Sequence, residues 1–233
     1  MALDPSSAEA FAARGLVRMN MWDLKGAKID LERAVTVAPG SAWVVRFYGH
    51  MLQAFGRQEE ALSAYRRAVD LDPLFTASWS WLAWAYLNHM EYSAARSAFQ
   101  RALELKADDI NLWGVTWSYL LEGHLDLAVT WSGKIKDEEN RVWARAAIEH
   151  ALGHRAKARA ALDSLIEKIG AKNPYGIAEH YAWRGELDRA FEWLDRAYEA
   201  HDIGYLKVDM ALKPLHGDPR WAAFLKRMNL PVD

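Results

Sequence analysis

The sequence contains no cysteine, no charge excess and no long apolar run. Without cysteine there is neither a disulfide framework nor a thiolate metal site. The 29 basic and 31 acidic side chains give a formal net charge of −2, which does not favour nucleic acid or an anionic membrane as partner. The longest strongly apolar stretch, 79–87, is too short to span a membrane, and residues 1–11 lack the features of a signal peptide. We therefore expect a cytoplasmic protein that binds neither nucleic acid nor membranes.

Motifs of catalysis are missing as well. The sequence has no phosphate-binding glycine loop, no nucleophile elbow and no metalloprotease helix motif. His150 and His154 are the best candidate metal pair, but Gly153 between them is typical of a turn, which should place them on different elements. Paired acids such as Asp108 and Asp109 are better explained as charges at helix N-termini. We expect no enzymatic activity, no cofactor and no metal.

What the sequence does contain is a repeat. One alanine recurs at successive steps of 34, 34, 33, 30 and 32 residues. These alanines are Ala27, Ala61, Ala95, Ala128, Ala158 and Ala190. In four of the six cases the alanine ends the phrase Gly-x-x-x-x-Ala. A period of this size indicates a stack of small units, none of which can bury its apolar face alone.

Each unit predicts two amphipathic helices of about three turns. The six units are expected at residues 8–41, 42–75, 76–108, 109–138, 139–170 and 171–200. Residues 1–7 are expected to be the remnant of a preceding repeat, because Leu3-Asp4-Pro5 repeats a phrase that ends a later unit, Leu71-Asp72-Pro73. This predicts that the chain is a piece of a longer protein. Residues 201–233 are expected to form an extended segment and a capping helix.

Small residues recur where two helices of a unit should lie closest. They are Gly15, Gly49, Ala83, Thr116, Ala146 and Ala178, and a bulky side chain there would cost roughly 1–3 kcal/mol. The turn inside a unit carries glycine in four of the six units, as a left-handed helix end favours. Trp22 and Met90 take this place in units one and three, so those two turns should differ from the others.

This pattern resembles the tetratricopeptide repeat over about residues 8–200, most specifically in the first three units. The resemblance implies an all-α, right-handed superhelical solenoid of about six helix-turn-helix units with a C-terminal capping helix. It also implies a non-enzymatic scaffold that binds a protein or peptide segment, or another domain of its parent protein. The ending from Lys207 to Leu225 is similar to bacterial multidomain regulators of the adenylyl cyclase and winged-helix activator types. That similarity implies a sensory or interaction module in signalling.

In this repeat family the first helix of each unit lines a concave groove. The resemblance therefore implies a partner-binding groove formed by Trp43, Arg46, His50, Gln53, Trp81, Trp84, Asn88, Trp113, Trp117 and Trp143. Exposed on one face, these aromatic side chains would mark a binding surface. Two alternatives remain open: residues 205–215 could fill the groove, or the indoles could bind a sugar or an aromatic metabolite. The sequence leaves the oligomeric state undetermined.

Overall fold

The computed structural model describes residues 7–232, and within that range every regular element is a helix. Residues 1–6, which belong to the expected remnant of a preceding repeat, lie outside the described residues. The helices are α1 (Ala8–Asn20), α2 (Leu24–Val37), α3 (Ala42–Ala54), α4 (Gln58–Leu71), α5 (Thr76–Asn88), α6 (Tyr92–Leu105), α7 (Asp109–Glu122), α8 (Leu125–Ser132), α9 (Glu138–Ala151), α10 (Arg155–Ile169), α11 (Pro174–Trp183), α12 (Leu187–Glu199) and α13 (Pro219–Arg227), with a short 3-10 helix at Lys213–Leu215.

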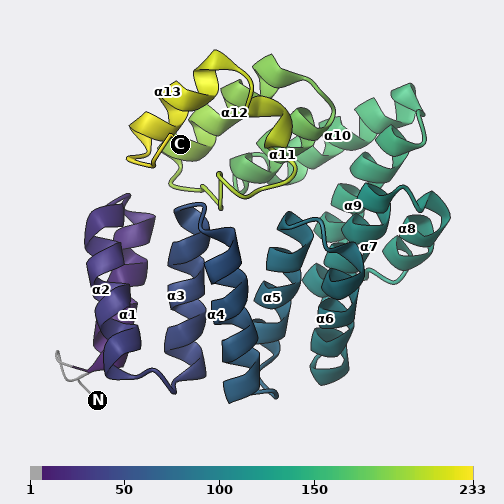
Figure 1. Ribbon diagram of the computed structural model, residues 1–233. Coiled ribbons are helices and arrows are strands. Elements are labelled where there is room, and N and C mark those ends of the chain that lie inside the picture. The colour runs from purple at the N-terminus through teal and green to yellow at the C-terminus, as the bar shows by residue number, and fades with distance from the viewer. Residues whose placement is uncertain (1–6, 233) are drawn as a thin grey trace.

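The helices pair as consecutive hairpins, from α1 with α2 to α11 with α12. The first hairpins stand side by side in chain order and form a curved row, while α11, α12 and α13 lie across the ends of α1 to α5 (Figure 1). Polar side chains fix where many helices begin. Ser7, Ser41 and Asp137, for example, each accept a hydrogen bond from a backbone N–H of the following first turn. Such a cap contributes about 1 kcal/mol to helix stability.

All six turns within the hairpins have the same left-handed backbone. Gly56, with φ of +77°, represents the four glycine turns, and Trp22 and Met90 have φ of +60° and +62°. In each hairpin an N–H just after this residue bonds to a carbonyl five residues back, as from Asp23 to Arg18 at 2.9 Å. The prediction that the Trp22 and Met90 turns would differ was therefore wrong. These two hairpins have the same geometry as the others. Trp22 and Met90 therefore adopt the left-handed backbone at a cost of about 1–2 kcal/mol each.

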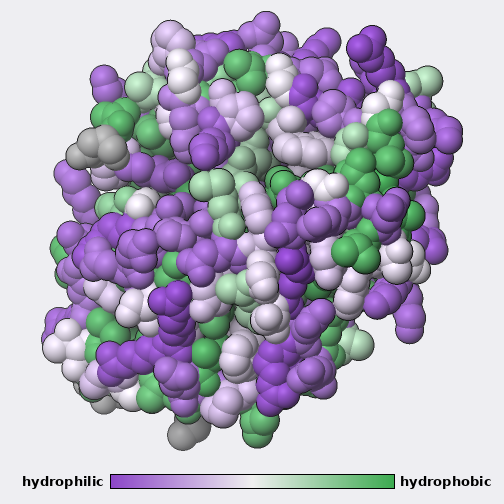
Figure 2. All heavy atoms as spheres, turned by 45° about the vertical axis from the view of Figure 1, so that its right-hand side comes forward, coloured by the Kyte–Doolittle hydropathy of each residue, from purple (hydrophilic) through white to green (hydrophobic). Residues whose placement is uncertain are grey.

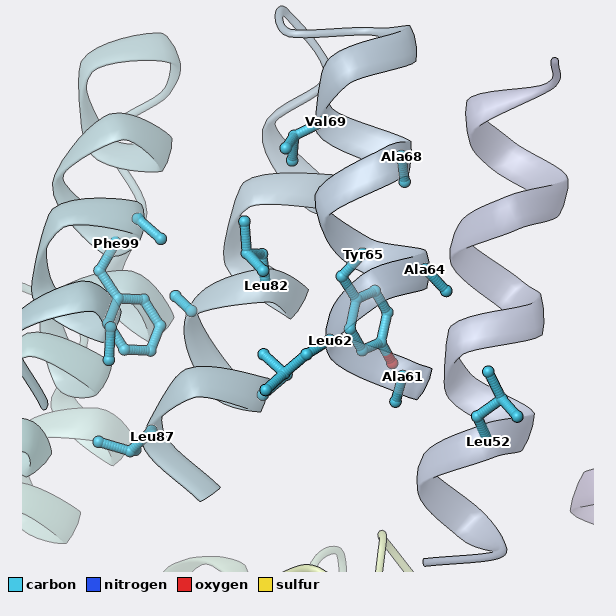
Figure 3. Packing of buried hydrophobic residues seen from close by; sticks show 14 of the residues in the cluster. Leu52, Ala61, Leu62, Ala64, Tyr65, Ala68, Val69, Leu82, Leu87 and Phe99 are labelled. Carbon is cyan, nitrogen blue, oxygen red and sulfur yellow. The ribbon is translucent and has the colours of Figure 1, made fainter. Parts of the chain in front are cut away.

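Close helix contacts explain the small residues of the repeat. A Cβ added to Gly49 would lie 2.8 Å from the ring of Tyr65, and one added to Gly15 would lie 2.7 Å from Leu31. Tyr65 is completely buried among Leu62, Ala61 and their neighbours (Figure 3). The six repeat alanines are also buried, at 1% exposure or less. Larger side chains there would force the two helices of a hairpin apart.

The C-terminal region folds back onto the first hairpins. The ring of Trp22, in the turn after α1, stacks on Tyr198 of α12 with ring centroids 6.2 Å apart, and on His201 at 5.6 Å. Leu24 of α2 belongs to the buried cluster formed mainly by the C-terminal helices. Conversely, Ala211 belongs to the buried cluster of the N-terminal hairpins. The two ends of the described chain therefore share one packed surface.

Residues 203–215, which we call the crossing segment, begin with irregular backbone at 203–205 and continue as turns and a short 3-10 helix. The sequence, by contrast, predicts an extended backbone for this stretch. The N–H of Val208 donates to the carbonyl of Tyr205 at 3.0 Å, and the carboxylate of Asp209 accepts from the N–H of Ala211 at 2.8 Å. The turns let Leu206, Val208 and Ala211 all point into the protein, where each is buried.

The surface is mainly hydrophilic on the face drawn in Figure 2, with hydrophobic residues in separate patches. Exposed apolar side chains include Ile29 on the outer helix α2 and Leu74 and Ile110 near the start of α5 and α7. None of the helices in the described part of the chain is both long and apolar enough to cross a membrane.

Candidate functional site

The predicted groove residues lie on α3, α5, α7 and α9, the first helices of units two to five. They differ in how much of each side chain reaches solvent. Arg46, His50, Gln53 and Trp117 are buried. Trp43, Trp81, Trp84, Asn88, Trp113 and Trp143 are partly buried. Among them the rings of His50 and Trp81 are in contact, with centroids 4.2 Å apart, and Tyr205 packs against both.

The crossing segment is anchored at Tyr205. Its hydroxyl lies 2.6 Å from Nδ1 of His50, a residue 155 positions earlier in the chain. Its ring also packs edge-on against Trp81, with ring centroids 5.6 Å apart. The C-terminal region of the chain therefore covers His50 and Trp81, two of the residues predicted to line the groove.

His50 is held between two polar partners. Arg46 lies 3.4 Å from Nε2 of His50, and because a guanidinium can only donate, Nε2 must accept. Nδ1 then carries the proton and donates to the hydroxyl oxygen of Tyr205. Burial, and next the charge of Arg46, lower the pKa of His50 well below its usual value. The imidazole is therefore neutral at pH 7.

Arg46 is a buried cation without an acidic partner among the described residues. Its guanidinium lies 4.0 Å from the ring centroid of Phe47, and its Nε has no hydrogen-bond partner. Burial lowers the pKa of Arg46. Gln53 is also used internally, because its Oε1 accepts a hydrogen bond from the hydroxyl of Tyr65 at 2.7 Å. Both polar side chains thus contribute to the interior of the protein.

A pair of carboxyl groups, Glu179 on α11 and Asp209 on the crossing segment, joins these two parts of the chain. Glu179 is hydrogen-bonded to Asp209, and the hydroxyl of Tyr175 donates to Oδ2 of Asp209 at 2.7 Å. Burial, and then the charge of Asp209, raise the pKa of Glu179 well above its usual value. Asp209 was not among the predicted site residues, since its partners lie about 30 positions earlier and no motif joins them.

Helices α5 and α7 also border a groove that is open to solvent. A groove of about 570 Å³ runs between the loop before α5 and the first turns of α5 and α7. Its lining residues are Leu74, Phe75, Thr76, Ala77, Ser80, Trp81, Trp84, Lys106, Asp108, Ile110 and Asn111. We call this the open groove. It includes Trp81 and Trp84 from the predicted set, whereas Trp113, Trp117 and Trp143 line a separate hollow.

The open groove has an apolar rim and one unusual polar group. Leu74 and Ile110 are 71% and 55% exposed, which is high for large aliphatic side chains. Asn111 is buried, yet its Oδ1 has no hydrogen-bond partner. An unpaired buried oxygen costs about 1–3 kcal/mol, a penalty that a donor on a bound molecule would remove. Asn111 was missed because it lies one residue beyond the groove positions of the repeat.

The histidine pair considered for metal binding lies across a hairpin turn, as its glycine indicates. Nδ1 of His154 lies 2.7 Å from Oε2 of Glu149, and the ring of His150 packs instead against Trp183 at 5.0 Å. Across residues 7–232 there is no group of three histidine or acidic side chains placed to hold a metal ion.

Comparison with known proteins supports the repeat. Residues 52–116 match the family model of the tetratricopeptide repeat, and this stretch contains most of the open groove. The protein CTR9 homolog of Arabidopsis thaliana is 30% identical over 91 residues. That alignment covers 39% of this chain but only 8% of the Arabidopsis protein.

Solved structures share the architecture at low sequence identity. A thermophilic tetratricopeptide repeat protein from Thermus thermophilus superimposes with a TM-score of 0.63 at 15% identity, covering 82% of this chain and 100% of that chain. PilF of Pseudomonas aeruginosa gives a TM-score of 0.57 at 20% identity, covering 71% of this chain and 78% of that chain. The expected fold class is therefore confirmed: the chain is an all-α solenoid of the tetratricopeptide repeat type.

Proposed function

We propose that this chain is a non-enzymatic scaffold that binds an apolar segment of another protein in the open groove. The observation that carries the proposal is the combination of exposed Leu74 and Ile110 with the unpaired Oδ1 of Asn111. Burying the two aliphatic side chains would be favourable by about 25 cal/mol for each Å² removed from water. A backbone N–H of a bound peptide can supply the donor that Asn111 lacks.

The shape of the open groove also favours a peptide over a small molecule. At about 570 Å³ it is wide and open along the first turns of two helices, and its apolar wall includes Trp81 and Trp84. Repeat solenoids in general use such concave surfaces for extended partners. The descriptions of the relatives give no support to the alternative of a sugar or aromatic-metabolite sensor.

The crossing segment sets the limits of this site. It covers His50 and Trp81, so a partner would enter from the side where α5 and α7 begin. In this proposal the polar groups expected to align a partner, Arg46 and His50, instead hold the chain's own C-terminal region. The regulator origin suggested by the ending would make the partner a domain of the same parent protein or of its signalling complex.

The experiment is selection of binding peptides from a random library displayed on phage, followed by affinity measurement on variants. Ile110→Asp places a charge in the open groove and should weaken the selected peptides at least about tenfold. Ile29→Asp is the matched control, because Ile29 is equally a helical isoleucine, 65% exposed, but on the outer helix α2. Peptides that bind the Ile110→Asp and Leu74→Asp variants as tightly as the unmodified chain would refute the proposed site.

A further inference from the structure

The second helix of unit four is much shorter than its counterparts. Helix α8 has 8 residues, whereas α2, α4, α6, α10 and α12 have 13 to 15. After Ser132 the chain turns and enters α9 at Glu138. Compared with the 14 residues of α2, α4 and α6, unit four lacks about six residues of helix, a length of about 9 Å.

A groove of about 530 Å³ lies beside this short helix, between α8 and α9. We call it the α8–α9 groove. Val129 and Ser132 of α8 line one side, and a face of α9 that begins at Glu138 lines the other as far as Leu152. Val129 and Leu152 are large apolar side chains and are 46% and 39% exposed. The groove shares no lining residue with the open groove.

In the preceding units the matching face of the first helix is covered. Helices α3, α5 and α7 each pack against the longer second helix of the unit before them. The third residues of these units, Val44, Ser78 and Asn111, are at most 2% exposed. In unit five the third residue is Arg141, which is exposed and lines the α8–α9 groove. The groove therefore runs along the face of α9 that a longer α8 would cover.

Position seven of the repeat shows the same change. Leu82 and Val115 occupy it in units three and four and are buried. Unit five has Arg145 there, which is exposed and lines the α8–α9 groove. Among the described residues Arg145 has no hydrogen bond and no ion pair. It lies four residues after Arg141 on the same helix, a spacing at which like charges repel each other.

The other charged residues that line the groove already have partners. Arg141 pairs with Glu138, which also lies 3.1 Å from Nζ of Lys168. Oε2 of Glu149 lies 2.7 Å from Nδ1 of His154. Arg145 is therefore the one lining charge whose counter-charge is missing from the described part of the chain. A carboxylate on a bound molecule would supply it.

We propose that the α8–α9 groove binds a short amphipathic helix of a partner protein, with an acidic side chain among its apolar residues. A helix is the matching shape, because the groove lies where the other units place a longer second helix. The apolar residues of the partner would cover Val129, Val142 and Leu152, and its carboxylate would pair with Arg145. From Val142 to Leu152 the face is about 15 Å long, which about three helical turns would span.

The first test is selection from a phage-displayed library of three-turn helical peptides with one randomised face. The unmodified chain is the target, and the Arg145→Glu variant is used in counter-selection to remove peptides that bind elsewhere. The enriched peptides are expected to combine apolar residues with aspartate or glutamate on the randomised face. No enrichment, or enriched peptides without an acidic residue on that face, would overturn the proposal.

The second test measures the contribution of the ion pair with a selected peptide. Replacing its acid by the matching amide should weaken binding about two- to fivefold at low salt, the range of an exposed ion pair. Raising the salt concentration should weaken the acidic peptide more than the amide peptide, because salt screens charges. Equal affinity of the two peptides at low salt would contradict the pairing with Arg145.

The third test exchanges the charges. Arg145→Glu should weaken the acidic peptide at least about tenfold, because repulsion replaces attraction, and a peptide with lysine in place of the acid should regain affinity for this variant. Lys28→Glu is the matched control, with the same change of charge on exposed α2, at the other end of the helix row (Figure 1). Far-ultraviolet circular dichroism verifies that each variant is folded. No regain with the lysine peptide would refute the contact.

The two surfaces can be separated experimentally. Ile110→Asp changes the open groove and should leave the selected helical peptides bound, because Ile110 does not line the α8–α9 groove. Loss of their binding in that variant would place them in the open groove and overturn this proposal. Arg145→Glu should in turn leave the peptides of the open groove unaffected. Each proposal can therefore fail without the other.

Discussion

Lowering the pH from 7.5 to 5.0 should destabilise the fold through His180 by about 2 kcal/mol. In the unfolded chain the pKa of a histidine is about 6.5, whereas burial lowers that of folded His180 to about 3. At pH 5.0 the unfolded state binds a proton that the folded state excludes. Linkage converts this difference into about 2 kcal/mol. The contribution is fully present above pH 6.5 and is lost as the pH falls from there towards the folded pKa.

The assay is urea denaturation at both pH values, followed by far-ultraviolet circular dichroism, for the unmodified chain and His180→Gln. Glutamine cannot bind a proton in this range, so the variant should lose about 2 kcal/mol less stability between pH 7.5 and 5.0. Other titrating groups cancel in the comparison. His124→Gln is the control for the loss of an exposed histidine, because the His124 side chain is 55% exposed. Parallel profiles for the unmodified chain and His180→Gln would refute the reasoning.

Three further substitutions test packing, backbone and anchoring. Gly176→Ala should destabilise the fold by about 1–3 kcal/mol, because its Cβ would lie 1.9 Å from the Trp143 ring, although alanine is the better helix former. Met90→Gly should stabilise the fold by about 0.5 kcal/mol or more, since glycine removes the left-handed penalty at φ of +62°. Tyr205→Phe should cost about 1–3 kcal/mol, because it leaves Nδ1 of buried His50 unpaired.

Urea denaturation measures all three, and each has its own check. Gly217→Ala is the control for Gly176, because no atom lies within 4 Å of the added Cβ; equal stabilities would mean that Trp143 moves aside freely. Met90→Ala should give no gain, so a gain there would point to the lost methionine side chain instead of the backbone. For Tyr205→Phe, an unchanged free energy of unfolding would mean that the hydroxyl contributes nothing to holding the crossing segment.

The helical hairpins are predictable from the sequence because their cause is local and periodic. Small residues such as Gly49 and Ala61 recur at the repeat spacing, and apolar residues recur at the spacing of one helical face. The conformation at Trp22 and Met90 was not predictable from residue type. Both side chains disfavour left-handed backbone, but the hydrogen bonds of the hairpin impose it.

The candidate site is less predictable because it depends on contacts between distant parts of the chain. The helix face that carries Trp81 and Trp84 follows from the repeat. The contact between His50 and Tyr205 spans 155 residues and belongs to no repeat. The crossing segment has no helical period, so its turns and its contacts with His50 and Trp81 emerge only in three dimensions. The same holds for the pair of Glu179 and Asp209.

The stacking of Trp22 on Tyr198 has a consequence for cooperativity. In a linear array of repeats each end frays alone, because a terminal unit contacts only one neighbour. Here the last hairpin also contacts the first, so each end of the array stabilises the other. Detaching the C-terminal helices would expose Leu24 and Trp22 to water and so weaken the opposite end. Melting at either terminus is thereby transmitted directly to the other, without passing through the repeats between them.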